Sequence, residues 1–294
     1  MRYLEKHPMV MIVVGVIGIA LSSIFVRYSA APSVVTAAWR LMWTVALMSP
    51  MVIGKKEVRR EFASVNRKTA ILSMVSGLFL AVHFSLWFES LRHTTVASST
   101  VICCTEVIWV SIGYCLFLKG RMSWKAVIAI GAALAGSVLI ALSDASGGGS
   151  HLYGDVLSLL SAVAVAIYVL IGRVVRKDTS TTVYTFMVYG ACAGALLMTC
   201  FVQGYGLLSY GGSAVIVGLL LAVFSTILGH SIFTWCLKYF SPSFVSASKL
   251  CEPVVAAVLA GFLFDEIPAP MQLGGGVLIL GGVLYYSRLE AKQE

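Results

Sequence analysis

Three charged side chains interrupt long apolar stretches of this sequence: Glu106, Lys249 and Glu252. A charge deep in a bilayer is costly unless it is paired, so such residues usually mark paths for solutes or protons. Lys249 and Glu252 are three residues apart, so they share one helix face and are expected to pair with each other. Such a pair is either a static structural contact or a substrate or proton site. Pro253 follows directly and is expected to loosen the helix as a hinge.

Glu106 is the second candidate for proton binding, because it lies near the middle of its own apolar stretch. A lysine beside a carboxyl group favours the charged form of that carboxyl group. Of the two glutamates, only Glu252 has a lysine nearby in the sequence. We therefore expect Glu106 to bind and release a proton more readily than Glu252.

Four further side chains have types suited to a binding cavity. Phe79, His83 and Trp87 follow one another at four-residue spacing, which places a titratable ring between two aromatic walls. This arrangement suits an amphipathic solute, although His83 could equally be a neutral imidazole bonded to a neighbouring helix. Arg40 lies near the outer end of its segment, where it either extends to the lipid headgroups or binds a substrate carboxylate. His230 is expected nearer the inner end of its helix, in packing.

The elements that position these residues are long apolar helices. Hydrophobic residues make up 59% of the 294 positions and charged residues only 12%, which leaves too little polar surface for a soluble globule. A membrane-spanning helix needs about 20 apolar residues. About ten such segments can be drawn, approximately at 9–26, 33–53, 70–90, 96–118, 124–142, 154–175, 183–201, 213–237, 244–264 and 271–287. The sequence therefore predicts an all-α polytopic membrane protein with ten transmembrane helices.

The distribution of Lys and Arg predicts the orientation of the chain. If the N-terminus is inside, these residues fall almost entirely in inner loops, and only Arg27 and Arg92 fall in outer ones. Both termini are then cytoplasmic, in an inner or plasma membrane. The net charge of +8 is explained by these loops and by anionic lipid headgroups, so no nucleic-acid partner is expected.

Motifs for catalysis, metals and cofactors are missing from the sequence. All seven cysteines fall within predicted spans, so no disulfide framework is implied. Cys103 and Cys104 are adjacent, but they lack the spacing and the histidine of a metal site. There is no phosphate-binding loop, zinc helix or nucleophile elbow. We expect no catalytic residue, no metal site, no cofactor and no enzymatic activity.

The two halves of the sequence resemble each other. Glu106 aligns with Glu252 at an offset of 146 residues, and the same offset brings Gly136 onto Gly282. Five helices per half is an odd number, so the second copy must enter the membrane from the opposite side. We expect two inverted five-helix repeats, residues 1–145 and 146–294, whose glutamates face one shared cavity.

Short stretches near these residues resemble the EamA branch of the drug/metabolite transporter superfamily. They are Ser-Pro-Ser at 241–243, Leu-Cys-Glu-Pro at 250–253 and the acidic turn at 265–266. The first half departs from the pattern, since Val107 stands where proline is common and Lys-Gly-Arg at 119–121 replaces the acidic turn. The resemblance implies a ten-helix secondary carrier whose central cavity opens alternately to either side, without ATP hydrolysis.

Together these features predict a carrier that exports a small amphipathic metabolite such as an amino acid, with protons as a candidate coupling ion. A carrier for organic cations, an importer, and a non-transporting lipid-handling or scaffold protein are the alternatives. The expected partners are a small-molecule substrate and the lipid bilayer, and the chain could be a monomer or a homodimer. The predicted substrate or coupling residues are Phe79, His83, Trp87, Arg40, Glu106, Lys249 and Glu252, with Pro253 as hinge.

Overall fold

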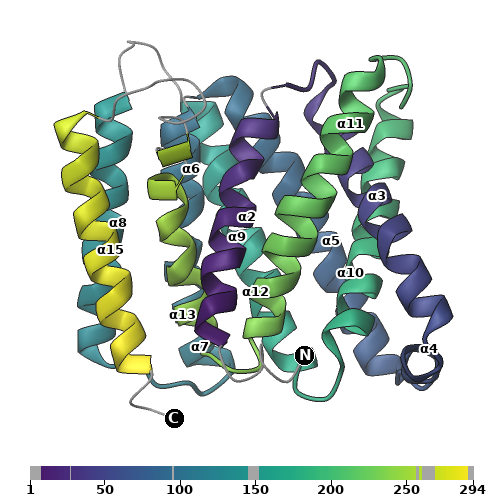
Figure 1. The fold of residues 1–294 in the computed structure, drawn as a ribbon, viewed down its shortest axis with the longest axis horizontal. Helices are drawn as coiled ribbons and strands as arrows, with labels where there is room; N and C mark the ends of the chain where they lie inside the picture. The colour runs from purple at the N-terminus through teal and green to yellow at the C-terminus, as the bar shows by residue number, and fades with distance from the viewer. Residues whose placement is uncertain are drawn as a thin grey trace.

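The elements of the chain that the structure describes are all helices (Figure 1). This computed structural model describes residues 8–26, 28–94, 96–144, 152–255, 258–259 and 269–290. The helices are α2 (Pro8–Val26), α3 (Ser33–Gly54), α4 (Lys56–Ala63), α5 (Arg67–His93), α6 (Val96–Cys104), α7 (Glu106–Phe117), α8 (Trp124–Asp144), α9 (Leu152–Val175), α10 (Thr181–Val202), α11 (Gly212–Leu220), η1 (Leu221–His230), α12 (Ser231–Cys236), α13 (Pro242–Ser248), η2 (Lys249–Cys251) and α15 (Pro270–Glu290).

Within the described residues, seven helical stretches are long and apolar enough to cross a membrane, which confirms the expected all-α polytopic membrane protein. They are Pro8–Val26, Ser33–Gly54, Arg67–His93, Ser99–Phe117, Leu152–Val175, Thr181–Val202 and Gly212–Cys236. The count of ten stays a prediction, because α8 and α15 are not among these seven and because residues 256–257 and 260–264 of the expected span 244–264 lie outside the described residues. The acidic turn at 265–266, Arg27 and the boundary between the two expected repeats also lie outside them.

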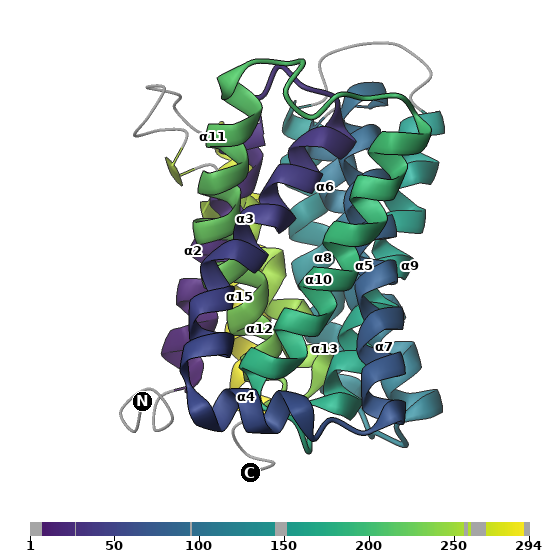
Figure 2. The same cartoon turned by 90° about the vertical axis from the view of Figure 1, so that its right-hand side faces the viewer.

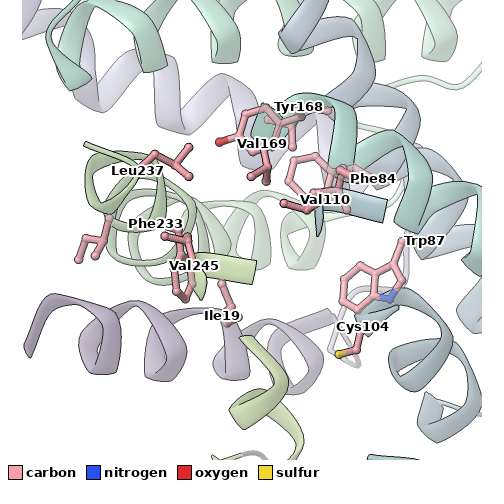
Figure 3. Close-up of a cluster of buried hydrophobic side chains, with 14 of the residues drawn as sticks. Ile19, Phe84, Trp87, Cys104, Val110, Tyr168, Val169, Phe233, Leu237 and Val245 are labelled. Atoms are coloured by element: carbon pink, nitrogen blue, oxygen red, sulfur yellow. The ribbon is translucent and has the colours of Figure 1, made fainter. Parts of the chain in front are cut away.

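Helices from the two halves of the sequence pack against each other throughout the bundle. α5 lies between α9 and α10, α3 contacts α10 and α11, and α2 runs along the π-helix η1 (Figure 1). Each of these contacts joins a helix before residue 145 to one after residue 151. The apolar core follows the same pattern, since Phe84 and Val110 meet Val169, Phe233 and Leu237 in one buried cluster (Figure 3).

Glycines allow α8 and α15 to approach each other very closely. A Cβ atom on Gly136 would lie 2.5 Å from the carbonyl oxygen of Gly275, and one on Gly282 would lie 2.6 Å from that of Ala129. Small residues at such crossings let two helix backbones come into direct contact within a membrane. Gly136 and Gly282 therefore serve the packing of these two helices.

Substituting Gly136 with alanine is expected to destabilise the protein by about 1–3 kcal/mol, because the added methyl group would overlap the backbone of α15. Gly131 lies on the same helix with open space where its Cβ would be, so it provides the control. Gly131→Ala should leave stability unchanged or raise it by up to about 1 kcal/mol, the difference in helix propensity. Thermal unfolding of both variants in detergent measures the difference, and equal midpoints would contradict the close contact.

Three of the spans are interrupted part-way along their length. Thr105 separates α6 from α7, and its hydroxyl donates to the Ile102 carbonyl at 2.6 Å. Residues 221–230 form a π-helix, and residues 249–251 form a single 3₁₀ turn. Such departures from α-helix geometry often occur at functional sites. In carriers, substrate and ion sites are typically built where transmembrane helices are discontinuous.

One end of the bundle carries a short amphipathic helix, α4, which lies across the ends of the spanning helices (Figure 2). None of its residues is buried, and Lys56, Arg59 and Arg60 are exposed. α2 begins and α15 ends at this same end of the molecule (Figure 1). The arrangement agrees with the distribution of basic loops, and the assignment of this end to the cytoplasm stays a prediction.

Candidate functional site

A cavity of about 60 Å³ lies among the interrupted helices. Its walls come from both halves of the sequence, from Ile19 in α2 to Glu252 after η2. The charged and imidazole side chains that line it are those of Arg40, His83, Glu106, His230, Lys249 and Glu252, together with the indole of Trp87. Six of the seven predicted site residues therefore meet at one cavity. Phe79 is the exception, because it packs half-buried against the core and is not among the lining residues.

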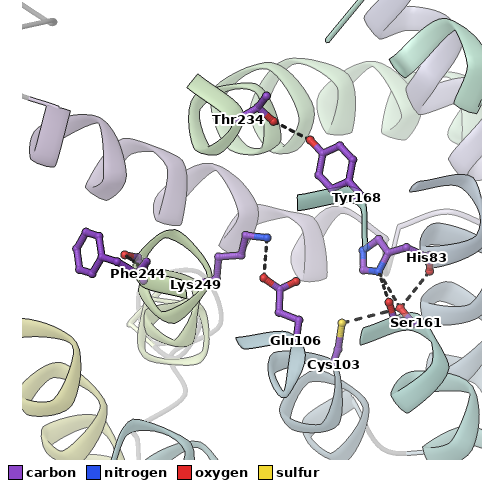
Figure 4. A network of polar contacts seen from close by, with 9 residues as sticks. His83, Cys103, Glu106, Ser161, Tyr168, Thr234, Phe244 and Lys249 are labelled. Atoms are coloured by element: carbon purple, nitrogen blue, oxygen red, sulfur yellow. Dashed lines mark hydrogen bonds and ion pairs between the residues drawn. The ribbon is translucent and has the colours of Figure 1, made fainter. Parts of the chain in front are cut away.

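Lys249 forms an ion pair with Glu106 at the cavity wall (Figure 4). Its Nζ atom donates to Glu106 Oε1 at 2.8 Å, and the two side chains are only 9% and 6% exposed. Lys249 also lies over the ring of Phe233, 5.5 Å from its centroid. The expected pairing of Lys249 with Glu252 is therefore wrong. Lys249 and Glu252 are three residues apart, but the carboxylate that Lys249 contacts is that of Glu106, in the other half of the chain.

Both glutamates follow directly after an interrupted helix. Glu106 is the first residue of α7, where the unpaired N–H groups of a helix start favour a negative charge. Glu252 follows the 3₁₀ turn, and its N–H donates to the Lys249 carbonyl. Pro253 has no N–H to make the corresponding α-helical bond. Whether it acts as a hinge stays a prediction.

Arg40 is fully buried in α3, with 1% of its surface exposed. Its Nε donates to the hydroxyl of Thr226 at 2.7 Å, and its guanidinium lies 4.3 Å from the centroid of the Phe84 ring. The Nη2 atom has no hydrogen-bond partner, and no described carboxylate forms an ion pair with Arg40. The alternative in which Arg40 extends to the headgroups is therefore wrong, because the side chain points into the protein.

The π-helix η1 explains how Thr226 reaches Arg40. The Thr226 hydroxyl donates to the Leu221 carbonyl at 3.2 Å, and the Ser231 hydroxyl donates to the Thr226 carbonyl at 3.1 Å. Both contacts join residues five positions apart, which is the spacing of hydrogen bonds in a π-helix. Residues 221–230 contain no proline and no Asp, Glu, Lys or Arg. The sequence therefore predicts an ordinary α-helical span there. Thr226 was missed for that reason.

His83 is both a hydrogen-bonded imidazole and a lining residue. Its Nδ1 lies 2.8 Å from the Ser161 hydroxyl and 3.2 Å from the Ser161 carbonyl (Figure 4). The ring stacks almost parallel to Trp87, with centroids 6.4 Å apart, and meets His230 edge-on at the same separation. His230 lies nearer the inner end of its span, as expected, but it lines the cavity, where packing alone was expected.

Buried polar atoms that have no hydrogen-bond partner among the described residues gather at the cavity. Five line it, namely Ser22 Oγ, Arg40 Nη2, Trp87 Nε1, Ser225 Oγ and Ser246 Oγ. Guanidinium and indole N–H groups can only donate, so they require an acceptor. Leaving such groups unsatisfied costs about 1–3 kcal/mol each. The cavity is therefore suited to a polar ligand with anionic or carbonyl oxygens.

Charge in the cavity is balanced but not fully paired. Lys249 and Glu106 neutralise each other, while Arg40 and Glu252 have no ion-pair partner among the described residues. The described part of the chain holds no group of three His, Cys, Asp or Glu side chains that could bind a metal ion. Within the part of the chain that the structure describes, the site therefore offers one cation and one carboxylate without an ion-pair partner, beside aromatic walls.

Comparison with known proteins agrees with this architecture. Residues 7–142 and again 152–288 match the EamA-like transporter family. The uncharacterized transporter YyaM of Bacillus subtilis (strain 168) is 27% identical over 262 residues, which cover 85% of this chain and 82% of that protein. An uncharacterized transporter of Archaeoglobus fulgidus is 24% identical over 284 residues, or 97% and 96% of the two chains.

A solved structure described as "Crystal structure of protein" shares the fold with a TM-score of 0.79 at 16% identity, covering 98% of this chain and 99% of the other. The family match covers both halves of the chain, and helices able to cross a membrane are present in each half. The chain therefore belongs to the EamA-like transporter family and is a multi-pass membrane transporter of the drug/metabolite type.

Proposed function

We propose that this protein is a secondary active carrier that exports a small zwitterionic metabolite such as an amino acid. The observation that carries the proposal is that Arg40 and Glu252 lie at one buried cavity and that neither has an ion-pair partner among the described residues. A positive and a negative side chain at separate points of the cavity are complementary to a solute that has a carboxylate and an ammonium group. The reaction is transport alone, without a cofactor, and the chain lies in the inner or plasma membrane with both termini cytoplasmic.

Each end of such a solute has a partner in the cavity. Arg40 Nη2 and Trp87 Nε1 are free to donate to a carboxylate, and a charge-assisted bond of this kind is roughly twice as strong as a neutral one. The carboxylate of Glu252 accepts from the ammonium group. The rings of His83 and Phe84 line the remaining wall and contact an apolar side chain.

Alternating access uses the interruptions in the helices. The Lys249–Glu106 pair joins α7 of the first expected repeat to η2 of the second, so it holds the two halves in one relative position. The cavity is smaller than the roughly 300–1,000 Å³ of pockets that enclose a small ligand, so it must widen when the substrate enters. Pro253 and the break at Thr105 are the proposed hinges, one in each half.

Counterflow in proteoliposomes tests the proposal. Vesicles preloaded with single unlabelled amino acids are expected to take up the same labelled amino acid with saturable kinetics for at least one of them. Choline, a quaternary amine without a carboxylate, provides the matched solute and should not exchange. Saturable choline exchange without amino-acid exchange would establish the organic-cation alternative instead. Absence of flux for every solute, with no shift in thermal unfolding by any of them, would favour a scaffold.

The sequence led us to expect Glu106 as the more readily titrating carboxyl, on the premise that Lys249 lies beside Glu252. Lys249 instead pairs with Glu106, so we assign proton coupling to Glu252. Glu252→Gln is expected to abolish the dependence of transport on a pH gradient, since glutamine cannot release a proton. Exchange at equal pH should persist at high solute concentration but with a lower apparent affinity, because the ammonium group loses its carboxylate partner. Glu89→Gln changes a carboxylate on the surface, in contact with His93, and should leave the gradient dependence intact. An unchanged pH-gradient response in Glu252→Gln would remove this residue from the coupling mechanism.

A further inference from the structure

A groove of about 420 Å³ opens on the outer face of the bundle between α7 and α8. Ile108, Ile112 and Leu116 form one wall at four-residue spacing, and Val127 and Ile130 form the other. α7 packs against α9 and α13, whereas α8 packs against α15, so these consecutive helices diverge. The groove lies outside the central cavity and shares no lining residue with it.

The depth of the groove matches one leaflet of a bilayer. Ile108 to Leu116 spans about 12 Å along a helix, and half of the hydrocarbon core is about 15 Å. Trp124, which begins α8, is 68% exposed, as is typical of an aromatic residue at the membrane–water boundary. The groove therefore runs from that boundary towards the middle of the membrane.

The turn at the boundary end of the groove carries positive charge. Lys119 and Arg121 are exposed in this turn, beside Met122 of the groove wall, and Lys125 is exposed on the first turn of α8. The turn is held in place, because the N–H groups of Leu118 and Gly120 both donate to the Tyr114 carbonyl, at 3.2 and 3.0 Å.

Gly120 also packs tightly against the Tyr114 ring, since a Cβ atom there would lie 2.3 Å from ring carbons. Lys119 has a positive φ of 52°, which fixes where the chain reverses. The basic side chains are therefore set at the end of the groove by a defined backbone.

We propose that this groove binds one anionic phospholipid. An acyl chain lies along the apolar walls, and the phosphate contacts Lys119, Arg121 and Lys125. Each basic residue near a membrane surface contributes attraction to anionic headgroups. A lipid in this position contacts α7 along its outer face, and α7 begins with Glu106 of the central ion pair. The inference does not depend on which solute is carried.

A second copy of the chain is the competing occupant of an apolar groove. If it docked through the same groove, it would bring its own basic turn, with Lys119, Arg121 and Lys125, close to this one. Like charges placed opposite each other disfavour association. The charge at the end of the groove therefore favours an anionic lipid over self-association.

Native mass spectrometry of the purified full-length protein tests the proposal. Titration with phosphatidylglycerol is expected to show one lipid retained at higher collision energy than phosphatidylcholine. The triple variant Lys119→Ser, Arg121→Ser, Lys125→Ser should bind phosphatidylglycerol about 100-fold more weakly, from the loss of three charge contacts. Ile112→Trp, which fills the groove without changing charge, should weaken both lipids equally.

A variant with the same loss of charge elsewhere provides the control. Lys56→Ser, Arg59→Ser, Arg60→Ser removes three exposed basic side chains from α4, away from the groove. It should keep the tightly held lipid, and thermal unfolding should show that all variants are folded. Equal weakening in both triple variants would mean diffuse attraction to the surface and would overturn the site. A dimer disrupted by Ile112→Trp, with no lipid retained, would establish a second copy as the occupant.

Discussion

Lys249→Met is expected to destabilise the protein by about 3–5 kcal/mol and to abolish transport. Lys249 and Glu106 are both almost fully buried, and removal of one partner leaves the other as an uncompensated charge in an apolar interior. The loss should be visible as a lower midpoint of thermal unfolding in detergent. Counterflow in proteoliposomes should fall to the background of empty vesicles.

A double variant separates the static role of this pair from its role in transport. Lys249→Met combined with Glu106→Leu removes both charges, so stability should recover to near the wild-type value, as it often does when a buried pair is replaced by apolar residues. Transport should not recover. Lys238→Met, at an exposed lysine, controls for the substitution itself. Full transport by the stable double variant would make the pair purely structural, and equal stability of Lys249→Met and Lys238→Met would contradict the pairing.

Arg40→Gln is expected to lower the affinity for a carboxylate-bearing substrate by roughly 10- to 150-fold. This is the loss of a hydrogen bond to a charged group, about 1.5–3 kcal/mol. Arg40→Lys keeps the charge but loses the planar group that binds Thr226 and stacks on Phe84, so it should recover only part of the affinity. The apparent affinity from counterflow measures both variants.

Arg92→Gln is the matched control for Arg40→Gln. The Arg92 side chain is 58% exposed at the surface, where its Nη1 lies 4.0 Å from Glu89 Oε2. It should transport like the wild type. If Arg40→Gln retained wild-type affinity for amino acids and also remained stable, the substrate carboxylate would bind elsewhere. A selective loss of amino-acid exchange, with folding intact, supports a direct contact.

Much of the fold could be predicted from the sequence, because lipid as a solvent leaves few alternatives to long apolar helices. The positions of Glu106, Lys249 and Glu252 at a shared cavity were also predictable, since buried charge in a membrane is rarely without a role. The ion-pair partner of Lys249 was not. Spacing along a helix identifies residues on one face, but it carries no information about a carboxylate 143 positions away.

The environment of Arg40 shows a second limit. Flanking residues and distance from the helix end suggested a side chain that could reach the headgroups. Its burial depends on Thr226, which the π-helix brings into reach, and on Phe84 from α5. These contacts come from three separate spans, so only the assembled bundle determines them. Residue spacing within one helix therefore could not predict the environment of Arg40, because that environment is formed by side chains from other helices.

The interleaving of the two halves has a consequence for how the protein is made. Lys249 follows Glu106 by 143 residues, and almost every early helix has its main packing partner in the later half. At about 5–20 residues per second, synthesis of that interval takes roughly 7–30 seconds. During this time Glu106 lacks the ion-pair partner that it has in the folded protein. We therefore expect the first half to be unstable by itself, and its stability to depend on the arrival of the second half.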